Sequence, residues 1–183
     1  MPEGDERSDI LLMELTASGD REAFARLISR HQRLVLSVAY RFLGSREEAE
    51  DAAQEVFLRL WRAAAKYRPE TALAAYLRTL TVNYCLDVRR KPRLLALDGG
   101  EDPPGQEDPH RDLEASERRG ALEAALQSLA PAQRMAVVLF HLEGASMKEA
   151  ARLLQISPKA LESLLGRARA TLRERLGSLL DAP

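Results

Sequence analysis

The fold is decided most clearly by residues 131–176, which read PAQRMAVVLFHLEGASMKEAARLLQISPKALESLLGRARATLRERL. Apolar residues recur there at helical spacing up to a break at residues 155–157, and an arginine-bearing helix is expected to begin at Pro158. The hydroxyl of Ser157 can cap that helix, and proline is tolerated at a first helical position because its missing N–H would be unpaired anyway. With Ala151 before the break and Leu161 after it, this spacing is typical of a helix-turn-helix.

The composition of the whole chain favours helices. It has 183 residues, of which 45% are hydrophobic and only 5% aromatic, and it is rich in Leu, Ala, Arg and Glu. The formal net charge of -1 argues against a protein that coats nucleic acid. The charge is uneven, however, because residues 91–116 are acidic and residues 117–183 are basic. We expect an all-α fold of two small helical domains joined by a flexible acidic linker.

Several classes of protein are excluded by what the sequence lacks. The N-terminus, with Glu3 and Asp5, has no basic start or apolar run, and the longest apolar run, residues 135–140, is too short to cross a bilayer. We therefore expect a cytoplasmic protein without direct membrane insertion. Cys85 is the lone cysteine, and the histidines at 31, 110 and 141 are scattered without metal-ligand spacing. Since no catalytic motif is present either, we expect no metal, no cofactor and no enzymatic activity.

The N-terminal half predicts a four-helix domain. Apolar residues from Ile10 to Arg90 recur every three or four positions, with breaks at residues 18–20, 44–45 and 68–69. Ser45 and Glu48 have the spacing of a capping box, which predicts a helix over residues 46–66. Its inward stripe comprises Ala49, Ala52, Ala53, Val56, Phe57 and Leu60.

The opposite face of that helix carries Asp51, Gln54, Glu55 and Leu58 at i, i+3, i+4 and i+7. An apolar leucine thus lies among acidic residues on a helix face that normally contacts solvent. Two interpretations remain open on the pattern alone. The face is either solvated with one exposed leucine, which monomer surfaces tolerate, or it binds another protein.

Residues 66–93 combine seven basic and two acidic side chains with Tyr67, Tyr76 and Tyr84. Basic groups that hold phosphates and rings that stack on unpaired bases are typical of a surface that binds single strands, although tyrosines at helical spacing are more often core residues. The following stretch, residues 93–116, has glycine and proline pairs among its carboxylates, so we expect a flexible linker. It is either a spacer or a segment that threads a basic channel.

These segments, in this order, resemble the bacterial sigma-70 superfamily, and specifically the short extracytoplasmic-function (ECF) sigma factors. Residues 20–24 (DREAF) and 49–61 (AEDAAQEVFLRLW) are similar to the core-binding helix of region 2. Residues 76–90 resemble its promoter-melting and minus-ten helix, although Leu73 and Tyr76 stand where Phe and Trp are usual. Residues 129–134, 144–146, 149–151 and 167–169 resemble region 4, which reads the minus-35 element.

The resemblance implies a transcription initiation factor that carries region 2 over residues 1–92, a linker over 93–116 and region 4 over 117–183. Region 2 would bind the clamp helices of the largest subunit of core RNA polymerase, region 4 would bind the flap of the second-largest subunit, and an anti-sigma factor would hold the protein inactive. The implied polymerase contacts are Asp51, Gln54, Glu55, Leu58 and Trp61. The implied minus-ten contacts are Lys66, Tyr67, Arg68, Arg78, Asn83, Asp87 and Arg90.

Helix-turn-helix geometry places a third set of residues toward the major groove or its phosphates. This set comprises Ser157, Lys159, Glu162, Ser163, Gly166, Arg167 and Arg169. Gln155 replaces the usual turn glycine, which costs about 1 kcal/mol if its backbone is left-handed. Glu162 and Leu164 stand where many relatives carry Lys and Arg. Glu162 either accepts a hydrogen bond from a cytosine amino group or simply faces solvent.

Two other functions compete with this interpretation. A helix-turn-helix regulator that acts without polymerase would explain the C-terminal half but not residues 51–61. A sigma mimic that titrates an anti-sigma factor would explain Glu162 and Leu164, but such mimics usually carry a signalling domain, and no segment fits one.

Overall fold

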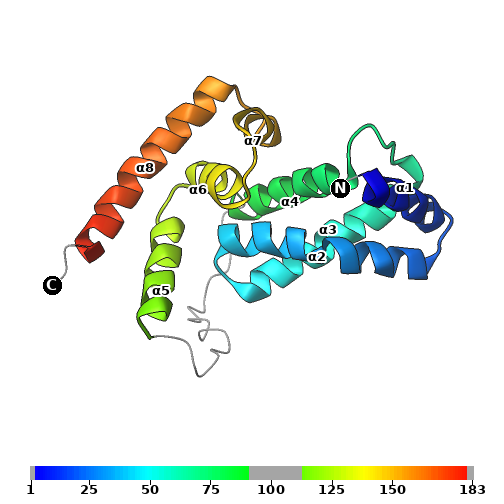
Figure 1. Ribbon diagram of the computed structural model, residues 1–183, viewed down its shortest axis with the longest axis horizontal. Coiled ribbons are helices and arrows are strands. Elements are labelled where there is room, and N and C mark those ends of the chain that lie inside the picture. Colours follow the sequence, from blue (N-terminus) through cyan, green and yellow to red (C-terminus); the bar gives the residue numbers. More distant parts are fainter. Residues whose placement is uncertain (1–2, 91–112, 181–183) are drawn as a thin grey trace.

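The computed structural model describes residues 3–90 and 113–180, and every regular element in these ranges is helical (Figure 1). The N-terminal half contains α1 (Glu3–Ala17), α2 (Arg21–Leu43), α3 (Arg46–Ala63), the 3-10 turn η1 (Ala64–Lys66) and α4 (Leu73–Arg90). The C-terminal half contains α5 (Leu113–Gln127), α6 (Pro131–Val137), the π-helical turn η2 (Val138–Leu142), α7 (Met147–Leu153) and α8 (Pro158–Leu180). The all-α prediction is confirmed.

The segment expected as a linker is described only at its end. Residues 93–112, including His110, lie outside the described residues. The helix α5 begins at Leu113, so residues 113–116 of the expected linker are helical. After α5, which ends at Gln127, the chain begins α6 at Pro131.

The break between α2 and α3 is built from two adjacent residues. Gly44 closes α2 with φ +79°, a left-handed conformation that favours glycine, and its N–H donates to the carbonyl of Tyr40 at 2.8 Å. The Oγ of Ser45 then caps α3 by accepting from the N–H of Glu48 at 3.2 Å. The side chain of Glu48 pairs with Arg89 of α4. The cap thus ends one helix, starts the next and ties both to α4.

The core of the N-terminal half lies between α1, α2, α3 and α4. Its largest fully buried side chains include Leu27, Val35, Leu60 and Leu77. The predicted inward stripe of α3 is confirmed, since all of its members are buried: Ala49, Ala52, Ala53, Val56, Phe57 and Leu60.

A second hydrophobic cluster joins the two halves of the chain. Val38 and Phe42 of α2 and Val82 of α4 belong to the same buried cluster as Met135 of α6 and Leu139 of η2. In Figure 1, α6 accordingly lies beside α4 and the C-terminal end of α2, with α7 above and α5 below. The sequence predicted two domains but gave no arrangement for them. The structure packs them directly against each other.

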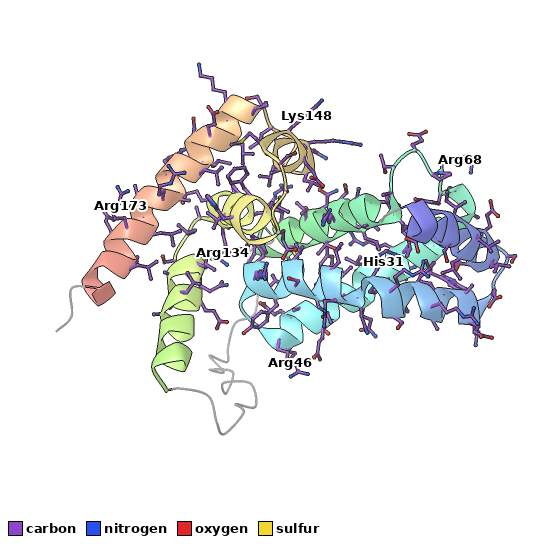
Figure 2. All side chains as sticks on the ribbon, in the orientation of Figure 1. His31, Arg46, Arg68, Arg134, Lys148 and Arg173 are labelled. Atoms are coloured by element: carbon purple, nitrogen blue, oxygen red, sulfur yellow. The ribbon has the colours of Figure 1, made fainter. Side chains whose placement is uncertain are left out.

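The N-terminal helix α1 is held on α2 by a buried carboxylate. Asp9 is 6% exposed, and its two oxygens bond Arg30 and the Nε2 of His31, the latter at 2.9 Å. Figure 2 places His31 between α1 and α2. His31 thus helps to hold α1 on α2, Cys85 is buried, and His141 is exposed on the surface.

No group of three or more metal-ligating side chains occurs within residues 3–90 and 113–180. Among the helices described, none combines the length and the apolar character needed to cross a membrane.

Candidate functional site

The outer face of α3 has the geometry that the sequence predicted. Asp51 and Gln54 are exposed, Leu58 is 42% exposed, and Glu55 is half-buried. Arg59 donates from Nε to Glu55 at 2.8 Å, and this hydrogen bond holds the pKa of Glu55 below its usual range. The face is therefore charged at its rim and apolar at Leu58.

Trp61 lies one turn further along α3 and is half-buried. Its ring meets Phe24 of α2 edge to face, with the centroids 4.9 Å apart. Such a pair fixes the orientation of both rings. Trp61 thus anchors α3 on α2 and leaves part of its ring at the end of the outer face.

The basic strip over residues 66–90 begins in the loop before α4. Lys66 and Arg68 are exposed, and Figure 2 shows Arg68 in this loop. Tyr67 packs on Tyr76 with centroids 5.5 Å apart, and its hydroxyl donates to the carbonyl of Thr71 at 3.2 Å. Both rings are half-buried against the core, so at most one side of each is available for stacking.

Further along α4 the side chains of the basic strip become half-buried. Arg78 is half-buried and bonds Glu149 of α7 at 3.4 Å, while its Nε–H is buried with no hydrogen-bond partner among the described residues. Asn83 is half-buried, and the exposed Asp87 and Arg90 form an ion pair at 3.6 Å. The expected minus-ten residues therefore split into exposed ends, with Lys66 and Arg68 at one and Asp87 and Arg90 at the other, and a half-buried middle in which Arg78 contacts α7.

Tyr84 lies where the basic strip on α4 meets the outer face of α3. The guanidinium of Arg59 lies over its ring at 5.1 Å from the centroid. Burial, followed by the nearby carboxylates of Glu55 and Asp51, raises the pKa of Tyr84. Its ring is thus part of the packing between α3 and α4.

The helix-turn-helix has the predicted form. Ser146 caps α7, and the Oγ of Ser157 caps α8 by accepting from the N–H of Ala160 at 3.2 Å. Gln155 has φ +56°, so the turn is left-handed and the residue is strained there, as expected for a position where glycine is usual. Ala151 and Leu161 are buried on either side of the turn.

The outer face of α8 is open. All seven expected minus-35 residues are exposed: Ser157, Lys159, Glu162, Ser163, Gly166, Arg167 and Arg169. Leu161, Leu165 and Ala168 form the buried face of the same helix. Figure 2 shows Lys148 on α7 and Arg173 on α8 pointing away from the body of the protein, so cations flank this face.

Sequence reasoning gave no role to Arg134, which is only 6% exposed. Its guanidinium donates to the carbonyls of Leu126 and Leu129 at the end of α5, to Gln127, and to the carbonyl of Phe42 in α2 at 2.9 Å. Burial lowers its pKa. Its place in the motif that begins region 4 was visible in the sequence, but a buried arginine that joins three helices was not.

Comparison with known proteins gives two family matches. The model described as sigma-70 region 2 matches residues 27–94, and that described as sigma-70, region 4 matches residues 119–172. The ECF RNA polymerase sigma factor SigM of Mycobacterium tuberculosis is 34% identical over 174 residues, covering 95% of this chain and 87% of that protein. The RNA polymerase sigma factor CarQ of Myxococcus xanthus is 36% identical over 170 residues, covering 91% and 97%.

Solved structures agree with these matches. CnrH, in complex with the cytosolic domain of CnrY, superposes with a TM-score of 0.67 and 27% identity, covering 96% of this chain and 99% of that one. RpoE of Bartonella quintana, in complex with the anti-sigma factor NepR, shares the fold with a TM-score of 0.64 at 22% identity, covering 84% and 96%. The fold and these matches define a sigma-70 protein with regions 2 and 4. The chain belongs to the ECF sigma factors, which direct RNA polymerase to promoters.

Proposed function

We propose that this sigma factor acts through three surfaces: the outer face of α3 binds core polymerase, the basic strip of residues 66–90 binds the melted minus-ten strand, and the outer face of α8 reads the minus-35 element. The observation that carries the proposal is the solvent exposure of Leu58, at 42%, amid the polar rim of α3.

The polymerase contact follows from how small interfaces concentrate binding energy. An apolar centre that becomes fully buried on binding contributes most, while a polar rim excludes water around it. Leu58 supplies that centre, and Asp51, Gln54 and Glu55 supply the rim. Trp61 adds a fixed ring at its edge. The clamp helices of the largest subunit are the partner implied by the family.

The minus-ten contact follows from charge. Lys66, Arg68 and Arg90 are exposed, and their interaction with strand phosphates weakens with salt. Stacking on Tyr67 is less sensitive to salt, because it depends on ring contact. The minus-35 contact follows from the open face of α8, where Glu162 would select cytosine and Arg167 and Arg169 would hold phosphates.

The remaining assignments are part of the same proposal. Residues 1–92 act as region 2, residues 93–116 as the linker and residues 117–183 as region 4, which binds the polymerase flap. The protein acts in the cytoplasm as an initiation factor rather than an enzyme. An anti-sigma factor controls it, as supported by CnrH, a relative of the same fold that was solved in complex with the cytosolic domain of CnrY.

The polymerase contact is tested by Leu58→Asp. A carboxylate at the apolar centre has to be desolvated on binding, so the variant should lose pull-down of core polymerase and drive no transcription in vitro. Its helical circular dichroism should stay intact, since Leu58 is exposed. Leu15→Asp on α1, where the leucine is 39% exposed, is the matched control and should retain both activities. Normal pull-down by Leu58→Asp would refute the assignment.

A gel shift separates this function from a regulator that acts without polymerase. The sigma factor should bind duplex promoter DNA weakly alone and firmly once core polymerase is added. Strong specific binding by the isolated protein would favour the regulator instead.

A further inference from the structure

Helix α3 carries two ion pairs between an arginine and a glutamate four residues apart. The Nε of Arg46 lies 2.8 Å from Oε1 of Glu50, and the Nε of Arg59 lies 2.8 Å from Oε1 of Glu55. The side chains of the first pair are 78% and 57% exposed, whereas those of the second are 38% and 31% exposed. Water and salt compete with an exposed pair, so the second pair is better placed to hold a side chain in one orientation.

The second pair also contacts an aromatic ring of the neighbouring helix. The central carbon of the Arg59 guanidinium lies 5.1 Å from the ring centroid of Tyr84 in α4, within the range of a cation–π contact. Tyr84 packs against both hydrophobic clusters, so the core fixes its ring. In the described part of the chain, Arg46 has no such ring contact. Arg59 is therefore held twice, by Glu55 on its own helix and by Tyr84 on α4.

Glu55 has one carboxylate oxygen left for another partner. Arg59 donates to Oε1, and within residues 3–90 and 113–180 no hydrogen bond reaches Oε2. The hydrogen bond from Arg59 lowers the pKa of Glu55, so the carboxylate stays ionised. An ionised carboxylate accepts strong hydrogen bonds from lysine or arginine side chains. Glu55 is thus a charged acceptor of fixed orientation beside Leu58.

The other polar residues of the outer face of α3 are not held in this way. Asp51 and Gln54 are exposed, and neither side chain bonds another of the described residues. A side chain that becomes immobilised at an interface loses rotamer freedom, and this loss opposes binding. Glu55 has already lost that freedom in the unbound protein. It can therefore bind a partner at a lower entropic cost than Asp51 or Gln54.

We propose that Arg59 is a positioning residue of the polymerase contact: supported by the ring of Tyr84, it fixes Glu55 so that the carboxylate meets a cation of core polymerase in a single orientation. Arg59 acts through Glu55, and Tyr84 acts through Arg59, so neither has to touch polymerase. The inference rests on the proposed function of the outer face of α3. It makes α4, the helix of the minus-ten residues, a support for the polymerase contact.

The test measures the affinity of the full-length protein, labelled at its amino terminus, for core polymerase by fluorescence anisotropy. Arg59→Gln should weaken binding by about three- to tenfold, because Glu55 then has to be immobilised on binding. Arg46→Gln is the matched control. It removes the same charge from the same helix and breaks an ion pair of the same length, and it should bind like the wild type. Wild-type affinity of Arg59→Gln would overturn the inference.

Two substitutions of Tyr84 test the support that its ring gives to Arg59. Tyr84→Leu removes the ring without changing the charge and should weaken binding about as much as Arg59→Gln. Tyr84→Phe keeps the ring and should restore wild-type affinity. Circular dichroism identifies a variant that fails to fold, and the Arg59 variants then decide the matter. A folded Tyr84→Leu that binds like the wild type would show that the ring does not support Arg59.

A double-mutant cycle separates positioning from a purely structural role. In a Glu55→Gln background, Arg59→Gln should weaken binding by less than about twofold, because its effect passes through a carboxylate that is already gone. An equal loss in both backgrounds contradicts the inference, since Arg59 would then contact polymerase itself or support the fold.

The variants Glu55→Gln and Leu58→Asp distinguish a failure of the positioning role from a failure of the polymerase contact itself. If both weaken binding while Arg59→Gln does not, only the positioning role is refuted. If neither weakens binding, the proposed polymerase contact is refuted and the inference with it.

Discussion

The two surfaces expected to contact DNA differ in what the rest of the chain does to them. The outer face of α8 is open at every residue expected to contact DNA, whereas the middle of α4 is covered by α7, with Arg78 paired to Glu149. Both helices follow the same amphipathic rule, by which polar residues lie opposite the buried stripe. That rule predicts which side chains of a helix point away from its own buried stripe. It does not tell whether a segment 71 positions away in sequence covers them.

The largest effect on stability is expected at Arg134, which bonds the C-terminal half to α2. Arg134→Leu leaves the carbonyls of Phe42, Leu126 and Leu129 without this donor, so the free energy of unfolding should fall by about 3–5 kcal/mol. Urea unfolding followed by circular dichroism measures the change. Arg173→Leu, at an exposed cation of α8, should stay within about 0.5 kcal/mol of the wild type. Equal stability of the two variants would mean that Arg134 does not hold the halves together.

On the exposed face of α8, the largest change in DNA recognition is expected for Glu162→Lys. A lysine no longer accepts from a cytosine amino group and attracts phosphates, so non-specific binding should rise while preference at one minus-35 position falls by about 1–3 kcal/mol. Selection from a promoter library with the polymerase holoenzyme measures both. If preference is unchanged at every upstream position, Glu162 faces solvent and reads no base.

A smaller effect is expected at the turn between α7 and α8. Gln155→Gly removes a side chain from a residue with φ +56° and should stabilise the protein by about 1 kcal/mol. Gly144→Ala, at a glycine with φ +68°, should destabilise it by a similar amount. The open face of α8 should be unaffected by either change. Destabilisation by Gln155→Gly would show that the glutamine side chain contributes more than its backbone strain costs.

The smallest effect concerns Cys85 on the covered side of α4. Burial raises the pKa of its thiol from 9.0 to about 12, so the folded state favours the neutral thiol. This contribution to stability is fully present below the ordinary thiol pKa of 9.0 and is lost as the pH rises toward 12. At pH 8 a thiol reagent should modify Cys85 only after unfolding in urea. Rapid modification of the native protein would show that this side of α4 opens readily.

Local features were predictable from the sequence because they depend on neighbouring residues. The cap at Ser45 and the buried stripe of α3 each involve positions within a few residues of one another. The exposure of Leu58 and of the α8 face followed from the same periodicity.

The packing of the N-terminal half against the C-terminal half was not predictable, because the bonds between them join residues that are far apart in the chain. Ser37 and Glu143 are separated by 106 positions, and Phe42 and Arg134 by 92. The π-helical turn that brings Glu143 to α2 is five residues long, which is too short to give a periodic signal in the sequence. Buried arginines are rare, so composition gives no reason to place Arg134 inside.

Glycine at position 44 provides both a left-handed backbone and room for Gln127. A residue of opposite chirality can separate these two roles. The backbone of Gly44 is left-handed, and the methyl group of an L-alanine would strike Gln127. A D-alanine introduced by chemical ligation prefers positive φ and directs its methyl group along the other Cα–H bond. It would also restrict the unfolded chain more than glycine does. A mirror-image residue at this single position therefore distinguishes a glycine needed for backbone handedness from one needed for room.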